Sequence, residues 1–377
     1  MTPNQEPSLF EHLSKIQDPR IERTKRHLLT DIPVIAVLAT ICAAESYPDI
    51  EEFGIDKEEW LRTFLELPNG IPSHDTFRRV FILLRMSQFQ EVFFSWIKQI
   101  AELSAGEIIA IDGKQLKGSK KKQPTTNEGL RMVSAWAEKN RPVLGQVKTA
   151  EKSNEITAIP ELLGLLSLKG CIVTIDAMGC QKEIVEQIVE QKADYVISLK
   201  GNQGNLHKDV ADYFAWAEKV KFRELEYDFF ETVEKGHGPI ETGRCFVTED
   251  VDWLAGGAAW AGLKSIVTVE SIREVIGKSA TCERRYFISS LGANAKENLR
   301  CVRGHWRIEN SLHWVSDVAF REDSCQIKVE NGAANMAILR HIALNLLNKE
   351  RSCKRSVKGK MLKAGRNQDY LLKVLNI

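Results

Sequence analysis

The order of apolar and polar residues predicts a crossover unit of a β-sheet in the middle of the chain. Cys171–Ile175 is a short apolar run rich in β-branched residues, which is typical of a buried strand. The run ends at Asp176, and Gly179 follows as a turn residue. Gln181–Gln191 then has apolar residues at helical spacing, and Tyr195–Leu199 predicts a second strand parallel to the first. An acid at the end of such a strand lies where α/β proteins hold functional groups, although capping the next helix is an alternative.

The same pattern of an apolar run that ends in an acid occurs earlier in the chain. Ile108–Ile111 leads directly into Asp112. Alternating residues at Met132–Ala137 and Val143–Lys148 predict two further strands in a hairpin, and Ile156–Leu166 predicts a helix. Three antiparallel strands followed by alternating helices and strands are, by analogy, the layout of an α/β, RNase H-like mixed sheet core.

Residues before this core have the pattern of a small helical domain. The predicted helices are Asp31–Glu45, Asp56–Glu66, one that Ser73 caps, and Phe89–Leu103 behind a capping box of Ser87 and Gln90. Arg78 and Arg79 lie on the third of these helices, where they could contact DNA phosphates as in a helix-turn-helix-like domain. A solvated charged surface is the alternative for each arginine.

Charge changes sharply after the core. Residues 203–250 hold 6 Lys/Arg and 11 Asp/Glu, whereas residues 349–377 hold 9 Lys/Arg and 2 Asp/Glu. Short strands at Arg244–Val247, Ser265–Ile272 and Arg285–Ser290 predict a largely β insertion, and helical periodicity returns at Lys296. The basic end predicts contact with a phosphate backbone, with a solvated tail as the alternative.

These patterns divide the chain into five segments. Residues 1–104 are expected to form the helical part with the candidate DNA contacts, 105–202 the first part of the sheet core, 203–291 the insertion, 292–348 the last part of the core, and 349–377 the basic C-terminal segment.

Composition excludes several classes of protein. The chain has 377 residues, 43% of them hydrophobic and 27% charged, and a net charge of +1, which is ordinary for a globular protein. Its longest apolar stretch, Ile32–Ala44, is shorter than the roughly 18 residues of a membrane span, and the N-terminus has no secretory signal pattern. The 8 cysteines include no CxxC pair. We therefore expect a cytoplasmic protein with free thiols and neither a zinc ribbon nor a membrane partner.

The two acids Asp112 and Asp176 are expected to lie on neighbouring strands of the sheet. Carboxylates so close repel each other unless a cation lies between them. Oxygen ligands favour Mg²⁺ or Mn²⁺, and two such ions roughly 4 Å apart can activate a nucleophile and stabilise a leaving 3′-oxygen. A third acid is expected, and Glu309 is the leading candidate because its helix should return to the sheet after the insertion.

Four polar residues around Glu309 recur every fourth position along that helix. They are His305, Glu309, His313 and Asp317. This ladder drifts around an α-helix with each step. A metal site made by the His-Glu-His part of the ladder alone is a rival hypothesis, but it leaves the two strand-end aspartates unexplained.

Several long blocks of sequence resemble one family. The blocks are IDGK at 111–114, EKSNEITAIPELL at 151–163, TIDAMGCQKEI at 174–184, LKGNQ at 199–203 and HWRIENSLHWVSDV at 305–318, with IEEFG at 50–54, IPSHDTFRRV at 71–80 and LRHIALNLL at 339–347. They are similar to DDE transposases of the ISAs1 type, the group of the H-repeat-associated proteins, within an IS4-like superfamily. The resemblance implies an RNase H-like core with a β insertion before the last acid, the triad Asp112, Asp176 and Glu309, and metal-dependent DNA strand transfer at the ends of an insertion sequence.

The sequence departs from the wider superfamily around the last acid. A signature of tyrosine, arginine, glutamate and lysine would require other residues at Val302, His305 and Ser316, so the hairpin-forming route tied to it is in doubt. Arg303 and Arg307 flank Glu309 as candidate phosphate contacts. Lys114 and Lys200 follow two of the strands and are further candidates, with a solvated lysine as the alternative. Trp306 and Trp314 are expected to pack in the core, or to stack on a displaced base.

The predicted function is that of an insertion-sequence transposase acting on double-stranded DNA, as a homodimer on its DNA. The alternatives are a metal-dependent nuclease on the same core and a DNA-binding remnant without activity. Glu322 and Asp323 compete with Glu309 for the place of the third metal ligand. Glu309 is preferred because a ligand on a long helix is held more rigidly than one on a loop.

Overall fold

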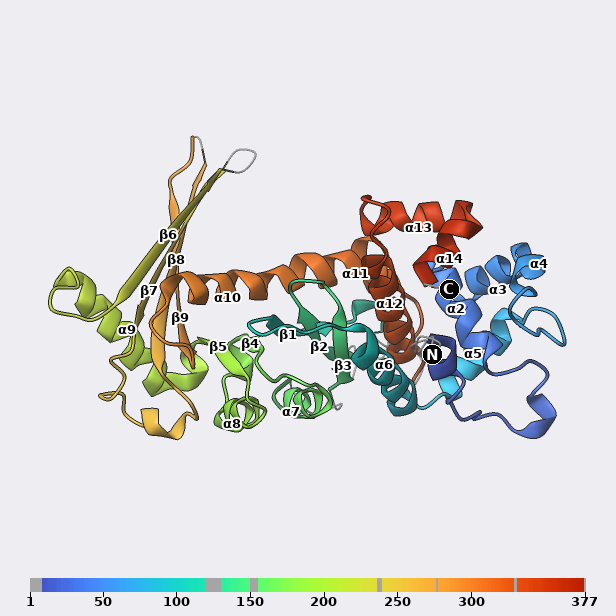
Figure 1. Ribbon diagram of the computed structural model, residues 1–377, viewed down its shortest axis with the longest axis horizontal. Coiled ribbons are helices and arrows are strands. Elements are labelled where there is room, and N and C mark those ends of the chain that lie inside the picture. Colours follow the sequence, from blue (N-terminus) through green and yellow to red (C-terminus); the bar gives the residue numbers. More distant parts are fainter. Residues whose placement is uncertain are drawn as a thin grey trace, which may run out of the picture.

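The computed structural model describes residues 9–119, 130–149, 155–235, 239–275, 277–328 and 331–375. They form an elongated α/β molecule around one nine-stranded mixed sheet, with helices along both faces and at one end (Figure 1). No helix in these ranges is long and apolar enough to cross a lipid bilayer.

Five strands form the part of the sheet that lies next to the helical end. They are β1 (Ile108–Gln115), β2 (Arg131–Ala137), β3 (Val143–Lys148), β4 (Ile172–Ile175) and β5 (Asp194–Leu199). The helix α7 (Glu155–Leu165) connects β3 to β4, and α8 (Lys182–Glu190) connects β4 to β5. Each predicted strand and helix of this region is confirmed, with boundaries that differ by a few residues.

The strands of this region lie in the order β3-β2-β1-β4-β5. β1 pairs antiparallel with β2 and parallel with β4, and β4 pairs parallel with β5. Pairing between β1 and β4 ends at Ile111 and Ile175. The prediction that β1 ends at Asp112 is wrong, because antiparallel pairing with β2 carries the strand on to Gln115. Asp112 and Asp176 nevertheless come directly after the last residues that pair between β1 and β4.

The predicted insertion extends the same sheet. Its strands are β6 (Asp228–Lys235), β7 (Pro239–Thr248), β8 (Ser265–Val275) and β9 (Thr281–Ser289), and β9 pairs antiparallel with β5. They project beyond the core as a long twisted ribbon (Figure 1). The insertion also contains α9 (Gly204–Lys219), which was not predicted, although Leu206, Val210 and Phe214 are buried at helical spacing.

The N-terminal segment contains helices whose boundaries differ from the predicted ones. Its helices are α1 (Leu9–Leu13), α2 (Asp31–Ile41), α3 (Tyr47–Asp56), α4 (Glu58–Leu61), α5 (His74–Leu83) and α6 (Met86–Ile100). The capping box predicted at Ser87 and Gln90 is wrong, since α6 begins before both residues and Gln90 is buried. A capping box occurs instead at Ser46 and Asp49, where it starts α3.

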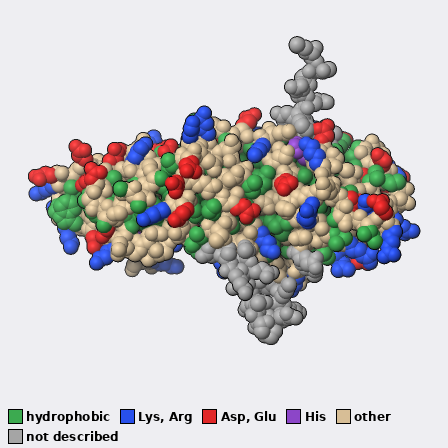
Figure 2. Space-filling view, turned by 90° about the horizontal axis from the view of Figure 1, so that it is seen from below, with side chains coloured by type: hydrophobic (Ala, Val, Ile, Leu, Met, Phe, Trp, Pro, Cys, Tyr) green, Lys and Arg blue, Asp and Glu red, His purple; other side chains and the backbone are tan. Residues whose placement is uncertain are grey.

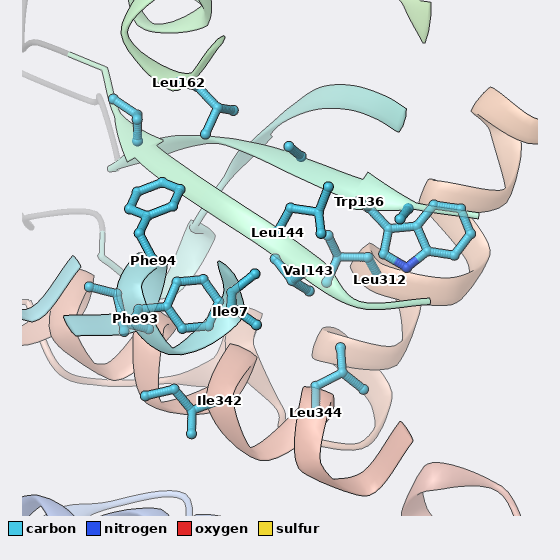
Figure 3. Close-up of a cluster of buried hydrophobic side chains, with 14 of the residues drawn as sticks. Phe93, Phe94, Ile97, Trp136, Val143, Leu144, Leu162, Leu312, Ile342 and Leu344 are labelled. Atoms are coloured by element: carbon cyan, nitrogen blue, oxygen red, sulfur yellow. The ribbon is translucent and has the colours of Figure 1, made fainter. Parts of the chain in front are cut away.

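The helix α12 (Gly332–Lys349) joins this segment to the sheet. It is buried on every side and packs against α2, α5, α6 and β3. Two buried amides fix it, since Asn335 donates to carbonyls of α5 and the loop after it, and Asn345 bonds both the N–H and the carbonyl of Val143. Side chains of α6, β3 and α12 form a single apolar cluster here (Figure 3). Two short helices, α13 (Val357–Arg366) and α14 (Gln368–Leu375), follow and also pack on α12.

One long helix crosses the sheet from the insertion to the helical end (Figure 1). It consists of α10 (Ala295–Ile308), a π-helical turn at Glu309–His313, and α11 (Trp314–Val318). α10 lies close to the sheet because it has glycine at the crossing: a Cβ on Gly304 would come within 2.7 Å of the Ile108 side chain. The helix therefore carries Glu309 directly over the edge where β1 and β4 separate.

Candidate active site

The two strand-end aspartates lie in one cleft. Asp112 and Asp176 both line a hollow of about 460 Å³ between the sheet and α10, together with Glu309. Asp176 also accepts a hydrogen bond from the N–H of Met178 at 3.1 Å, so it caps the 3-10 turn Ala177–Gly179. The capping alternative for Asp176 is thus realised alongside its position in the cleft.

All four residues of the helical ladder face this edge of the sheet. His305 hydrogen-bonds Thr174 on β4 through Nδ1 at 3.1 Å. His313 contacts Asp112 through Nε2, 3.1 Å from Oδ2. Asp317 accepts a hydrogen bond from Nζ of Lys114 on β1 at 2.5 Å. The helix is therefore held to β1 and β4 along its whole passage over the site.

The π-helical turn explains why the ladder does not drift away from the sheet. Four residues of an α-helix turn through about 400°, so each step of the ladder would rotate by about 40°. A π turn, with its i→i+5 hydrogen bonds, is wider and compensates for this rotation just where Glu309 and His313 lie. Single π turns inside α-helices occur frequently at functional sites.

The donor atoms at this site suit a divalent metal ion. Asp112, Glu309 and His313 each offer one ligand atom, and these atoms all lie within 4.8 Å of one another. Carboxylate oxygens are the ligands that Mg²⁺ and Mn²⁺ prefer, and an imidazole nitrogen is a further ligand that Mn²⁺ accepts less readily than heavier transition metals. The sequence suggested His313 as a metal ligand only in the rival His-Glu-His hypothesis. In the structure His313 lies next to Asp112 as well as Glu309.

Electrostatics keep Asp112 ionised. Burial raises the pKa of its carboxyl, but the hydrogen bond from His313 and the charges of His313 and His305 outweigh burial, and the pKa lies below its usual range. Burial lowers the pKa of His305, against the opposing effect of Asp112 and Asp176. A fourth acid, Glu155, lies beside the site, and its pKa is raised first by burial and then by the charges of Asp176 and Asp112.

The predicted phosphate contacts have different surroundings. Lys114 is mostly buried, and its ammonium group bonds the carbonyl of His313 and the carboxylates of Asp317 and Glu322. These three acceptors match its three donors, which leaves none for phosphate. Lys200 is exposed and lines the cleft.

The four candidate arginines lie outside the cleft. Arg303 pairs with Glu234 of β6 at 2.5 Å, and Arg307 pairs with Glu138. Arg78 and Arg79 are both exposed on α5, and Arg78 lies 3.5 Å from Asp75. None of these ion pairs is buried, so Arg78, Arg303 and Arg307 can each exchange a carboxylate for a phosphate at small cost.

The tryptophans beside Glu309 are not core residues. The prediction that Trp306 and Trp314 pack in the core is wrong, since 38% and 58% of their surfaces are exposed. Trp306 lines the cleft, and the guanidinium of Arg285 lies 4.1 Å from the centre of its ring. Arg285 was missed because it belongs to β9, and its sequence neighbours do not show that β9 returns beside β5.

The competitors of Glu309 are engaged elsewhere. Glu322 is buried and pairs with Lys114 at 2.9 Å. Asp323 pairs with Lys117 at 2.7 Å. Neither residue lines the cleft that holds Asp112 and Asp176.

Comparisons with known proteins give one consistent result. Residues 103–346 match the transposase DDE domain family, and residues 10–97 match the DDE_Tnp_1-associated family. The chain is 42% identical over 375 residues to "Putative transposase YncI" of Escherichia coli O157:H7, covering 98% of this chain and 94% of that protein. It is 39% identical over 374 residues to "H repeat-associated putative transposase YhhI" of Escherichia coli (strain K12), covering 97% of both.

Among solved structures, a piggyBac transposase synaptic complex with hairpin DNA aligns with 98% of this chain and 78% of that chain. Its TM-score is 0.42 and its sequence identity 11%, a similarity too low to support conclusions about this chain.

Proposed function

Because this chain belongs to the transposase DDE domain family, it is a DNA transposase, and we propose that Asp112, Asp176 and Glu309 are its catalytic triad. The observation that carries this assignment is their common place in one cleft, with Asp112 and Asp176 at the end of paired β1 and β4 and Glu309 on the helix above. The reaction is hydrolysis of a phosphodiester at the end of an insertion sequence, followed by attack of the freed 3′-hydroxyl on target DNA.

The proposal includes the architecture of the catalytic core. The strand order β3-β2-β1-β4-β5, with β1 antiparallel to β2 and parallel to β4, supports an RNase H-like fold. In this scheme residues 105–202 and 292–348 form the core and 203–291 the insertion. Residues 1–104 and 349–377 supply DNA contacts, to which Arg78, Arg79, Lys200, Arg303 and Arg307 contribute. Two copies on a pair of element ends form the active assembly, which works at the nucleoid.

DDE transposases generally use divalent metal ions, and we assign two Mg²⁺ or Mn²⁺ ions to this site. Such ions lower the pKa of an attacking water and stabilise the charge of the leaving 3′-oxygen. Asp112, Asp176 and Glu309 would hold them through carboxylate oxygens. His313 orients the carboxylate of Asp112 by its hydrogen bond. His305 hydrogen-bonds Thr174 and so holds the helix against β4.

Near-isosteric substitutions test the triad. We expect Asp112→Asn, Asp176→Asn and Glu309→Gln each to reduce Mg²⁺-dependent cleavage of a duplex carrying the repeats that flank the gene by about 10³-fold or more. Binding of the same duplex should change little, since the contacts assigned to DNA are made by other residues.

The matched control is Asp323→Asn, which removes an acid close in sequence that pairs with Lys117 outside the cleft. If Glu309→Gln cleaves at the wild-type rate while Asp323→Asn is inactive, the third ligand is Asp323. If either aspartate variant keeps the wild-type rate, the two-metal assignment is wrong.

A further inference from the structure

Lys114 lies at the centre of a buried ion-pair cluster beside the candidate active site. The cluster consists of Lys114, Asp317, Glu322 and Arg340. The Lys114 ammonium lies 2.5 Å from Asp317 and 2.9 Å from Glu322, and Arg340 lies 3.8 Å from Glu322. Only 13% of the Lys114 side chain and 3% of the Glu322 side chain are exposed. The cluster has two positive and two negative groups and is neutral overall.

The cluster connects the two elements that carry the metal-binding side chains. Lys114 is two residues after Asp112 on β1, so both side chains point to the face of the sheet that α10 covers. Its ammonium also donates to the carbonyl oxygen of His313 at 3.3 Å. That carbonyl belongs to the last residue of the π turn that begins at Glu309. The same His313 contacts Asp112 through its ring.

From this geometry we infer that Lys114 is a positioning residue, which fixes the π turn so that Glu309 and His313 meet Asp112. Asp317 on α11 and Glu322 in the turn after the helix have a supporting part, since each carboxylate accepts a hydrogen bond from the Lys114 ammonium. The inference rests on the proposed function, because the geometry that Lys114 fixes matters only if Glu309 and Asp112 bind metal. It replaces the phosphate contact predicted for Lys114, whose donors are all occupied within the protein.

A charge-balanced pair of variants separates positioning from stability. Lys114→Met alone leaves the carboxylates of Asp317 and Glu322 with Arg340 as the one remaining cation of the cluster, and it should lower the melting temperature sharply. Lys114→Met combined with Glu322→Gln removes one charge of each sign, so the cluster remains neutral and much of that loss should be recovered. We expect the double variant, folded and free of DNA, to bind Mn²⁺ about 10–100-fold more weakly than wild type, as measured by electron paramagnetic resonance.

A double-mutant cycle asks whether Lys114 acts through the helix that carries Glu309. Glu309→Gln should weaken Mn²⁺ binding by itself. If Lys114 positions Glu309, adding Glu309→Gln to the double variant should weaken binding much less than it does in wild type. If the ion pairs of Lys114 only stabilised the fold, the double variant would bind Mn²⁺ with wild-type affinity. If they affected the metal site independently of Glu309, the two fold-losses of Mn²⁺ affinity would multiply.

Lys117→Met is the matched control, because Lys117 makes its ion pair with Asp323, in the turn after the helix, and 69% of its side chain is exposed. Its Mn²⁺ affinity should equal that of wild type. Asp317→Asn is the milder second variant if the double variant does not fold, and it should lose affinity in the same direction. If the folded double variant or the folded Asp317→Asn variant binds Mn²⁺ with wild-type affinity, the inference is wrong, while the assignment of the triad stands. Wild-type affinity in Asp112→Asn, Asp176→Asn and Glu309→Gln would instead overturn the proposed function.

Discussion

At the scale of single residues, Glu155 is an acid whose negative charge is repelled by those of Asp112 and Asp176 when no metal ion is bound. It begins α7, and its carboxyl group occupies the space beside Gly113, where a Cβ would come within 2.2 Å. Asp112 and Gly113 are consecutive in β1 and point to opposite faces of the sheet. Glu155 thus approaches β1 from the face opposite α10, and burial followed by Asp176 and Asp112 raises its pKa.

We expect Glu155→Gln to stabilise the metal-free protein at neutral pH. A raised carboxyl pKa means that the folded state holds the proton more tightly than the unfolded state, so stability falls as pH rises from the unfolded to the folded pKa. Above that window Glu155 is charged in both states and destabilises the fold, whereas glutamine does not. The melting temperature in EDTA at pH 7.5 should rise by about 1–3 °C.

The control for this prediction is Glu161→Gln, an exposed acid on the same helix. It should not change the melting temperature. The stabilisation by Glu155→Gln should disappear at a pH below the unfolded pKa, where glutamate is protonated in both states. A lower melting temperature for Glu155→Gln at pH 7.5 would contradict the electrostatic argument.

The sequence predicts the aspartates of the site much better than their neighbours. An apolar run that ends in an acid is a local pattern, so Asp112 and Asp176 could be found from a few residues each. The contacts of Lys114 and Arg285 depend on Glu322 and Trp306, which are far away in the chain. No local pattern contains such a pair, because it arises only when distant elements fold together.

At the scale of elements, the fit between α10 and β1 depends on one glycine. A Cβ at Gly304 would lie 2.7 Å from Cδ1 of Ile108. Ile108 belongs to the buried part of β1, whose backbone is fixed by pairing on both sides. Since neither partner can move freely, we expect a side chain at residue 304 to push α10 away from the sheet and to displace Glu309 with it.

We expect Gly304→Ala to lower the free energy of unfolding, because overpacking costs about 1–3 kcal/mol. The gain in helix propensity, about 1 kcal/mol, offsets only part of this cost. Ile108→Val removes the colliding Cδ1, so the double variant should regain much of the stability. Urea unfolding followed by circular dichroism measures both effects.

Gly164→Ala is the comparison, since Gly164 lies in α7 and its added Cβ would meet no atom closer than 3.7 Å. That substitution should stabilise the protein through helix propensity alone. If Gly304→Ala were equally stabilising, the close packing of α10 on β1 would not limit the position of Glu309.

Periodicity predicts regular elements and misses the irregular turn between them. The sequence has helical spacing through residues 296–319, which predicts one helix but cannot show where a π turn interrupts it. The π turn depends on contacts of His313 and Asp317 with β1. The ladder from His305 to Asp317 was therefore visible in the sequence, while the reason that all four residues face the sheet was not.

At the scale of the whole molecule, charge is separated between the two ends. The acidic region 203–250 begins the insertion at one end, whereas the basic region 349–377 lies with α13 and α14 near the other (Figure 1). Lys and Arg side chains gather at this second end on the face that Figure 2 shows. The net charge of +1 conceals this separation. A polyanion is expected to approach the surface of α13 and α14 first.

The basic segment is folded, so not all of its charges are available to DNA. Lys360 is buried, and its ammonium donates to the carbonyls of Leu347 and Glu350. Lys354, Arg355 and Lys358 are exposed. Deleting residues 1–104 or 349–377 would expose the apolar surface of α12, so surface substitutions test DNA binding by these segments more cleanly than truncation does.

We expect Lys354→Gln, Arg355→Gln and Lys358→Gln together to weaken DNA binding at low salt and to flatten its salt dependence. Each phosphate contact releases about 0.9 counterion from duplex DNA, so three lost contacts reduce the slope of log K against log salt by about 2.7. Fluorescence anisotropy at four or five salt concentrations measures this slope.

The control is Lys219→Gln, Lys221→Gln and Lys264→Gln, which removes three exposed charges at the acidic end. Because that end should repel the polyanion, the control slope should match wild type; equal losses in both triple variants would mean that the charge separation does not orient the DNA.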